Sequence, residues 1–297
     1  MNLWKLTLAY DGTNFHGWQI QPTLPTVQGT LAAAIRHITG ETVLPQGSGR
    51  TDTGVHALEQ VASFALAAPI PPANLLRALN RALPPAIRIL SAEHAPPGFH
   101  ARHSALRKTY EYRIFPRVPL TPTDSGAPRL DSETCDPHSS GEPDLICPPT
   151  HAPYVWDCPW PISLELAQIA AAKILGEHDF SSFAASDPDL AHRNPPGAPS
   201  QTASSFEVGS TDAESSHSLV RTIFQSDFHS ESPLILYRVA GSGFLHHMVR
   251  NLVGTFVDIA CGRIPPDSIP FILAARNRAA AGPTAPARGL FLVSVDY

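Results

Sequence analysis

The sequence predicts an α+β protein built from two similar halves. Alternating apolar strands and helices with an apolar stripe follow one another along the chain, and this succession occurs twice. A stretch rich in Pro, Ser, Thr and Asp separates the two occurrences and has no usable periodicity. We therefore expect a first half over residues 1–115, an insertion over residues 116–160, and a second half over residues 161–297.

The first half is expected to contain four strands and two helices. Thr26 is a suitable N-cap for the first helix, and Gly40 is a suitable end. The second helix begins at Pro71-Pro72, and Pro84-Pro85 ends it because proline cannot continue a helix. The predicted strands cover residues 4–10, 62–66, 87–93 and 106–115.

The second half is expected to begin with a helix from Ser163 to Gly176, followed by a polar insertion over about residues 186–217. Its most periodic segment runs from Leu245 to Ile259 and ends at Gly262, which predicts a long amphipathic helix. The remaining predicted elements are strands over 219–228, 234–240 and 289–296 and a short helix over 268–277.

Charge is distributed unevenly along the chain. The formal net charge is −5, but residues 121–160 carry a net −6 and residues 187–217 a net −4, so the other residues carry +5. A basic surface beside acidic loops is compatible with a phosphate-backbone partner. The densest basic cluster consists of Arg102, Arg107, Lys108, Arg113 and Arg117.

The composition favours a folded protein of the reducing cytoplasm. No run of 18 or more apolar residues occurs, which argues against a membrane span. The first residues lack the basic, apolar and small-residue zones of a signal peptide. Four cysteines without CxxC spacing do not require a disulfide framework.

The densest motif is the glycine-rich stretch 47–57, which contains Arg50 and Asp52. Taken alone, an Asp-Thr-Gly triplet favours a surface turn in which the carboxylate caps local amides. The stretch fails as a dinucleotide fingerprint, because its third glycine comes five residues after the second instead of three. It fails as a phosphate loop, because Val55-His56 replaces the Lys-Ser/Thr pair that contacts the phosphates.

A carboxylate pair of the aspartic-protease type is a third interpretation of this stretch. Asp52-Thr53-Gly54 and Asp124-Ser125-Gly126 supply the two triplets that such a pair needs. Each triplet should follow an apolar strand, and neither does, while the second lies in the Pro-rich insertion. The protease interpretation is therefore disfavoured.

The chain shows no spacing typical of a zinc site. The nearest candidates are His100 with His103 and Cys147 with His151, and neither pair has a companion pair at zinc-like spacing. We therefore expect no metal.

Five motifs in order resemble those of the tRNA pseudouridine synthase A family, and together they frame nearly the whole chain apart from the two insertions. The motif of the glycine-rich stretch is Gly49-Arg50-Thr51-Asp52-x-Gly54-Val55-His56-Ala57. The other four are Tyr10-Asp11-Gly12-Thr13-x-Phe15-x-Gly17-Trp18-Gln19, Phe99-His100-Ala101-Arg102 with Lys108-Thr109-Tyr110-x-Tyr112, His178-Asp179-Phe180-Ser181-Ser182-Phe183, and Gly243-Phe244-Leu245-x-x-Met248-Val249-Arg250-Asn251-x-x-Gly254.

The resemblance implies a fold of two ferredoxin-like halves with joined antiparallel sheets and a central RNA-binding cleft. It implies isomerisation of uridine to pseudouridine at positions 38, 39 and 40 of the tRNA anticodon stem-loop, without cofactor or metal. Family members act as homodimers in which one tRNA contacts both subunits. An enzyme that accepts uridine at any of three neighbouring positions is suited to recognise RNA by its shape and backbone more than by its base edges.

The resemblance also assigns roles to four residues. Asp52 matches the catalytic aspartate, and Arg250 matches its counter-charge. Tyr110 matches a tyrosine that can stack on a uracil flipped out of the RNA, and Arg50 is our candidate for filling the space that the base leaves. It stays open whether Asp52 attacks C1′ or C6, or instead removes a proton from the sugar. His56 and Gln60 are expected to support the site.

Two features depart from the family pattern. His103 stands where the family more often has an aromatic or acidic residue, and the insertions are long and acidic. Because acidic loops repel phosphate, we expect the insertions to project away from the cleft. Two alternatives remain: a tRNA-binding protein without catalysis, and a synthase of the same chemistry that acts at other RNA positions.

Overall fold

The computed structural model describes residues 1–118, 145–185 and 218–297. The helices are α1 (Val27–Thr39), α2 (Pro72–Ala82), α3 (Leu164–Ala172), α5 (Met248–Ala260) and α6 (Ser268–Ala275). The strands are β1 (Asn2–Tyr10), β2 (Gln46–Gly47), β3 (His56–Leu66), β4 (Ile87–His94), β5 (Arg107–Pro116), β6 (Trp156–Cys158), β7 (Gly176–Asp179), β8 (Val220–Glu231), β9 (Leu234–Gly241) and β10 (Leu290–Asp296).

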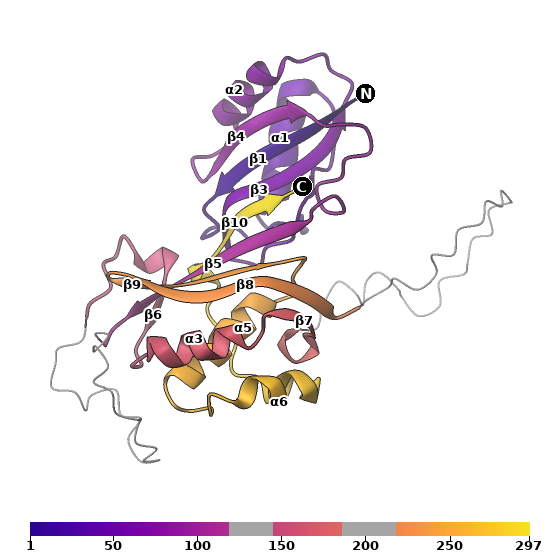
Figure 1. Ribbon diagram of the computed structural model, residues 1–297. Helices are drawn as coiled ribbons and strands as arrows, with labels where there is room; N and C mark the ends of the chain where they lie inside the picture. Colours follow the sequence, from indigo (N-terminus) through magenta and orange to yellow (C-terminus); the bar gives the residue numbers. More distant parts are fainter. Residues whose placement is uncertain (119–144, 186–217) are drawn as a thin grey trace, which may run out of the picture.

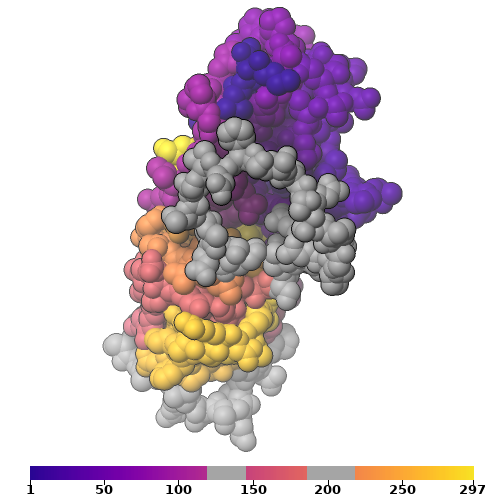
Figure 2. Space-filling view, turned by 90° about the vertical axis from the view of Figure 1, so that its right-hand side faces the viewer, coloured from indigo at the N-terminus to yellow at the C-terminus, as the bar shows by residue number. Residues whose placement is uncertain are grey.

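One mixed sheet runs through both halves, in the order β4-β1-β3-β10-β5-β9-β8-β7, with β2 beside β3 and β6 beside β5. Helices α1 and α2 accompany the strands of the first half, and α3, α5 and α6 those of the second (Figure 1). The two halves form opposite ends of the molecule, indigo to purple and orange to yellow (Figure 2). The predicted α+β class with joined sheets is confirmed.

The first half follows the signals in its sequence closely. Thr26 caps α1 by accepting a hydrogen bond from the backbone N–H of Gly29 at 3.2 Å. Gly40 ends the helix in the left-handed conformation, with φ at 75°, which glycine adopts without a steric penalty. Helix α2 begins at the second proline of Pro71-Pro72. The apolar residues that alternate along β1, as predicted, are buried in the hydrophobic core.

The joint between the halves is formed by β10, the final strand. It pairs in parallel with β3, where Phe291 lies opposite His56, and antiparallel with β5, where Leu290 lies opposite Tyr112. The chain therefore returns from the second half to complete the sheet beside the first (Figure 1). This joint places the loop before β3 next to the second half.

Two helices of the second half begin or end differently from the sequence prediction. Ser163 caps α3 as expected, but the helix ends at Ala172, before Gly176 begins β7. Helix α5 begins at Met248 instead of Leu245, because His247 has a left-handed backbone (φ 59°) that cannot belong to a right-handed helix. The short strands β2, β6 and β7 were not predicted.

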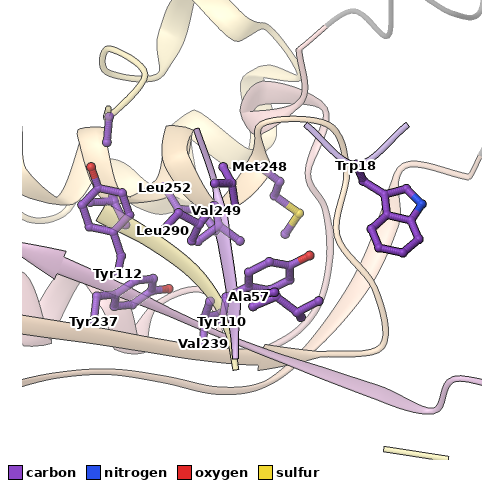
Figure 3. Packing of buried hydrophobic residues seen from close by; sticks show 14 of the residues in the cluster. Trp18, Ala57, Tyr110, Tyr112, Tyr237, Val239, Met248, Val249, Leu252 and Leu290 are labelled. Carbon is purple, nitrogen blue, oxygen red and sulfur yellow. The ribbon is translucent and has the colours of Figure 1, made fainter. Parts of the chain in front are cut away.

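Helix α5 covers the tyrosines of the central strands. Figure 3 shows Met248, Val249 and Leu252 of this helix above Tyr110 of β5 and Tyr237 of β9. All five side chains are buried in one continuous core. The strong periodicity of this segment therefore reflects burial against the sheet.

No helix within the described ranges has the length and apolar character needed to cross a membrane. Residues 119–144 and 186–217 lie outside the described residues. They include most of the acidic insertions, whose expected direction is therefore not tested, and the second triplet of the protease interpretation.

Candidate active site

Asp52 lies in the loop that connects β2 to β3, and the segment 12–18 packs tightly against this loop. A β-carbon at Gly12 would lie 2.0 Å from the carbonyl oxygen of Val55, and one at Gly17 would lie 2.6 Å from that of Thr51. Both distances are far inside van der Waals contact, so only glycine fits at either position. The two glycines therefore let one backbone segment support another directly beneath Asp52.

Buried hydrogen bonds fix the same loop from the strand side. The Gln60 amide donates to the carbonyl oxygen of Gly49 at 2.9 Å, and the Ser48 hydroxyl donates to the Gln60 side-chain oxygen at 2.5 Å. The hydroxyls of Thr51 and Tyr10 lie 2.8 Å apart. Because these groups are buried, leaving any of them unpaired would cost about 1–3 kcal/mol. The loop is therefore held in one conformation.

Arg250 reaches Asp52 from the other half of the molecule. Its Nη1 lies 3.2 Å from Oδ2 of Asp52, and its Nε donates to the carbonyl oxygen of Ala285 at 2.7 Å. The side chains are only 15% and 20% exposed, which fits the partly buried position expected for Arg250. The guanidinium offsets part of the cost of removing the carboxylate from water.

Two histidines that the sequence did not single out also face Asp52. Nε2 of His246 lies 3.5 Å from Oδ1, and Nε2 of His247 lies 3.3 Å from Oδ2. They occupy the first two of the four unassigned positions of the last motif, directly before α5. The N-terminal end of a helix carries partial positive charge, which also favours a carboxylate there.

His247 has a left-handed backbone at the position where its ring contacts Asp52. A φ of 59° is uncommon for a residue other than glycine and costs about 1 kcal/mol or more. The rings of His246 and His247 lie side by side, with centroids 3.9 Å apart. Burial lowers the pKa of His247 below its usual value, with Asp52 acting in the opposite direction.

Tyr110 lies beside this cluster on β5. Its ring meets Phe244 edge-on, with centroids 5.0 Å apart, and Figure 3 shows it near Met248. A β-carbon at Gly49 would lie 3.7 Å from its hydroxyl oxygen, so the hydroxyl faces the Asp52 loop. Burial raises the pKa of Tyr110 far above its usual value, so the phenol, which is protonated at neutral pH in any case, stays protonated in alkaline solution as well.

Arg50 is exposed on the same loop, two positions before Asp52. His56 is buried at the start of β3, where its Nδ1 accepts a hydrogen bond from the backbone of Gly12 at 3.0 Å. The structure thus brings Asp52 and Arg250 into contact and places Tyr110 beside the loop that carries Asp52. His246, His247 and Phe244 are the site residues that the sequence did not single out.

Lys108 is a largely buried cation next to the loop. Its Nζ donates to the carbonyl oxygen of Ser48 at 2.5 Å. Burial, assisted by the charges of Arg102 and Arg221, lowers the pKa of Lys108 from 10.5 to about 8. Above pH 8 the folded protein therefore loses a proton that the unfolded chain retains up to about pH 10.5.

This shift predicts that Lys108 makes stability rise with pH. Below pH 8 the lysine is charged in both states, so it adds no pH dependence. Between pH 8 and 10.5 the unfolded chain binds more protons, so stability increases. We expect the free energy of unfolding of the wild type, minus that of Lys108→Met, to rise by about 2 kcal/mol from pH 7.5 to pH 10. Urea unfolding of both proteins measures this difference, and a flat difference would contradict the lowered pKa.

Asp52, His246 and His247 are also the one group of three potential metal ligands among the described residues. Their donor atoms all lie within 4.8 Å of one another. The pairs considered from the sequence, His100 with His103 and Cys147 with His151, belong to no such group in the described part of the chain.

Comparison with known proteins gives a consistent result. A family model described as tRNA pseudouridine synthase matches residues 7–104 and 170–297. The chain is 43% identical over 294 residues to tRNA pseudouridine synthase A of Solibacter usitatus, which covers 99% of the chain and 98% of that relative. It is 40% identical over 295 residues to the protein of the same name from Moorella thermoacetica, covering 99% and 98%. The protein of that name from Maridesulfovibrio salexigens is 40% identical over 296 residues, covering 99% and 89%.

Proposed function

The chain belongs to the tRNA pseudouridine synthase family, and from this membership we propose that it isomerises uridine to pseudouridine at positions 38, 39 and 40 of the tRNA anticodon stem-loop. The activity of the family is that of an isomerase acting on tRNA. The proposed reaction breaks the C1′–N1 bond, turns the uracil while it is held, and joins C5 to C1′. C5 loses its proton and N1 gains one, so the product is an isomer of the substrate.

The observation that carries the proposal is the environment of Asp52. Its carboxylate lies on a rigid loop, 3.2 Å from the Arg250 guanidinium contributed by the other half. A carboxylate nucleophile needs orientation and desolvation more than it needs a base, because at neutral pH an aspartate is ordinarily ionised. We assign this role to Asp52. The proposal leaves attack at C1′, attack at C6 and proton removal from the sugar as alternatives.

Asp52 is only 20% exposed, so the target uridine must leave its base stack to reach the carboxylate. Flipping the base out costs a few kcal/mol. We propose that the Tyr110 ring stacks on the flipped uracil and that Arg50 enters the vacated space and contacts phosphate. The exposure of Arg50 and the protonated, loop-facing phenol of Tyr110 support these roles. Neither role requires a cofactor.

The remaining proposals concern the partners. We propose the anticodon stem-loop as the part of tRNA that is bound, in a cleft between the halves, by a cytoplasmic homodimer. The excess positive charge outside the two acidic segments supports a phosphate-backbone partner.

The direct test is to incubate the purified protein with unmodified tRNA transcripts and map pseudouridine at single-nucleotide resolution. We expect modification at positions 38, 39 and 40 in transcripts with uridine there, and none in transcripts with cytidine at all three positions. Modification elsewhere would retain the chemistry and change the substrate. Binding without modification would favour the tRNA-binding protein that lacks catalysis.

A further inference from the structure

The cluster of Asp52, His246 and His247 has the dimensions of a tetrahedral metal site. Zinc–ligand bonds of about 2.0–2.1 Å at tetrahedral angles separate the donor atoms by about 3.3 Å. Nε2 of His246 lies 3.5 Å from Oδ1 of Asp52, and Nε2 of His247 lies 3.3 Å from Oδ2. One donor atom from each of the three residues lies within 4.8 Å of the other two. An ion would therefore need only small side-chain movements to bind all three residues.

The cluster is also both pre-formed and accessible. The left-handed backbone of His247 and the adjacent ring of His246 hold two imidazoles on the same side of Asp52. The three side chains are 20–30% exposed, so an ion can enter from solvent and keep a water molecule as its fourth ligand. Three protein ligands and one open position are typical of an accessible zinc site.

The donor set selects the kind of ion. Two imidazoles and one carboxylate suit Zn²⁺ and Co²⁺, whereas Mg²⁺ prefers oxygen ligands and keeps most of its water. Arg250 contacts Oδ2 and repels a second positive charge there, so the ion would bind Oδ1, the oxygen that faces His246. His247, which faces Oδ2, would have to shift toward Oδ1. This repulsion makes binding reversible instead of structural.

We propose that Asp52, His246 and His247 bind Zn²⁺ reversibly and that the bound ion blocks the active site. The ion occupies the carboxylate that would otherwise act on the nucleotide, so Zn²⁺ competes with tRNA. The inhibitory part rests on the proposed function of Asp52, whereas the binding part rests on the donor geometry alone.

Binding is tested without activity, by titrating the purified full chain with Zn²⁺ in a calorimeter and with Co²⁺ in a visible spectrophotometer. We expect one equivalent of either ion to bind, and Co²⁺ to produce the intense visible bands of a tetrahedral complex. His246→Gln, His247→Gln and Asp52→Asn should each weaken binding by about tenfold or more. The matched control is His103→Gln, in the pair His100–His103, whose ring centroids lie 4.4 Å apart without a third ligand in the described residues.

Circular dichroism shows whether each variant folds. If a histidine variant does not fold, Asp52→Asn still tests the site. Binding that is equal in the wild type and all three ligand variants, or absent from the wild type, would overturn the proposal.

Inhibition is then measured as the rate of pseudouridine formation with micromolar Zn²⁺ in excess Mg²⁺. We expect Zn²⁺ to lower the rate and EDTA to restore it. Zn²⁺ binding in a protein that forms no pseudouridine would refute the proposed function but not the metal site. Activity that persists with Zn²⁺ bound would refute inhibition alone.

Discussion

Replacing Asp52 with asparagine is expected to lower kcat for pseudouridine formation by about 10⁴-fold or more, the loss typical when a catalytic nucleophile is removed. Asparagine has nearly the same shape, so the loop and its support by Gly12 and Gly17 should persist. The amide cannot provide the negative charge or the nucleophilic oxygen that the reaction requires. Single-turnover assays with excess enzyme measure the loss, and filter binding should give a Kd for tRNA within a few-fold of the wild type.

Asp258→Asn is the matched control, because Asp258 is a carboxylate of the same helix that carries Arg250. It pairs with Arg263 at 3.0 Å, away from the Asp52 cluster. The pair is partly buried, with Asp258 14% and Arg263 30% exposed, and it lies at the opposite end of α5 from Arg250. This variant should therefore retain activity within about twofold. A folded Asp52→Asn protein that still forms pseudouridine at the wild-type rate would exclude Asp52 as the nucleophile.

Gly254→Ala is expected to cause the largest loss of stability among alanine replacements of the described glycines. A β-carbon at this position of α5 would lie 1.7 Å from the carbonyl oxygen of Pro283 and 3.3 Å from the amide nitrogen of Ala285. The backbone of residues 283–285 must therefore move away from the helix. We expect the free energy of unfolding to fall by about 3 kcal/mol or more.

The same displacement should reach the active site. Ala285 accepts from the Arg250 side chain and donates its amide to the Arg250 carbonyl oxygen at 3.1 Å, so moving residue 285 releases the guanidinium from its anchor. Denaturant unfolding measures the stability, and kcat at a temperature where the variant remains folded measures the effect on the site. Gly243→Ala is the control, because its β-carbon would meet only ordinary contacts at 3.6 and 3.7 Å. Equal stability of the two variants would contradict the predicted clash.

Local signals in the sequence predicted the elements well where one residue determines a boundary. Thr26 and Gly40 delimit α1 because a side-chain cap and a left-handed glycine act through neighbouring backbone alone. The place of β10 between β3 and β5 could not be predicted, because the residue pattern of a strand indicates its faces but not its neighbours. Strands β6 and β7 are too short to show a pattern.

The site was predicted only in part for a related reason. The motif resemblance identified Asp52 and Arg250, which the structure places in contact. A helix predicted from Leu245 would have placed His246 and His247 as ordinary helical residues. Both rings instead lie against the carboxylate, and the left-handed conformation of His247 between them and α5 depends on tertiary contacts that the sequence does not reveal. Tyr110 proved to be both a core residue and a neighbour of the loop.

The position of β10 has a consequence for biosynthesis. A ribosome adds residues 290–296 after every other described strand, so β3 and β5 leave the exit tunnel long before the strand that separates them in the finished sheet. Until then each exposes a row of unpaired backbone groups that can recruit strands from other nascent chains. Aggregation during overproduction should thus depend on how quickly translation reaches β10, and chaperones that shield strand edges should raise the yield.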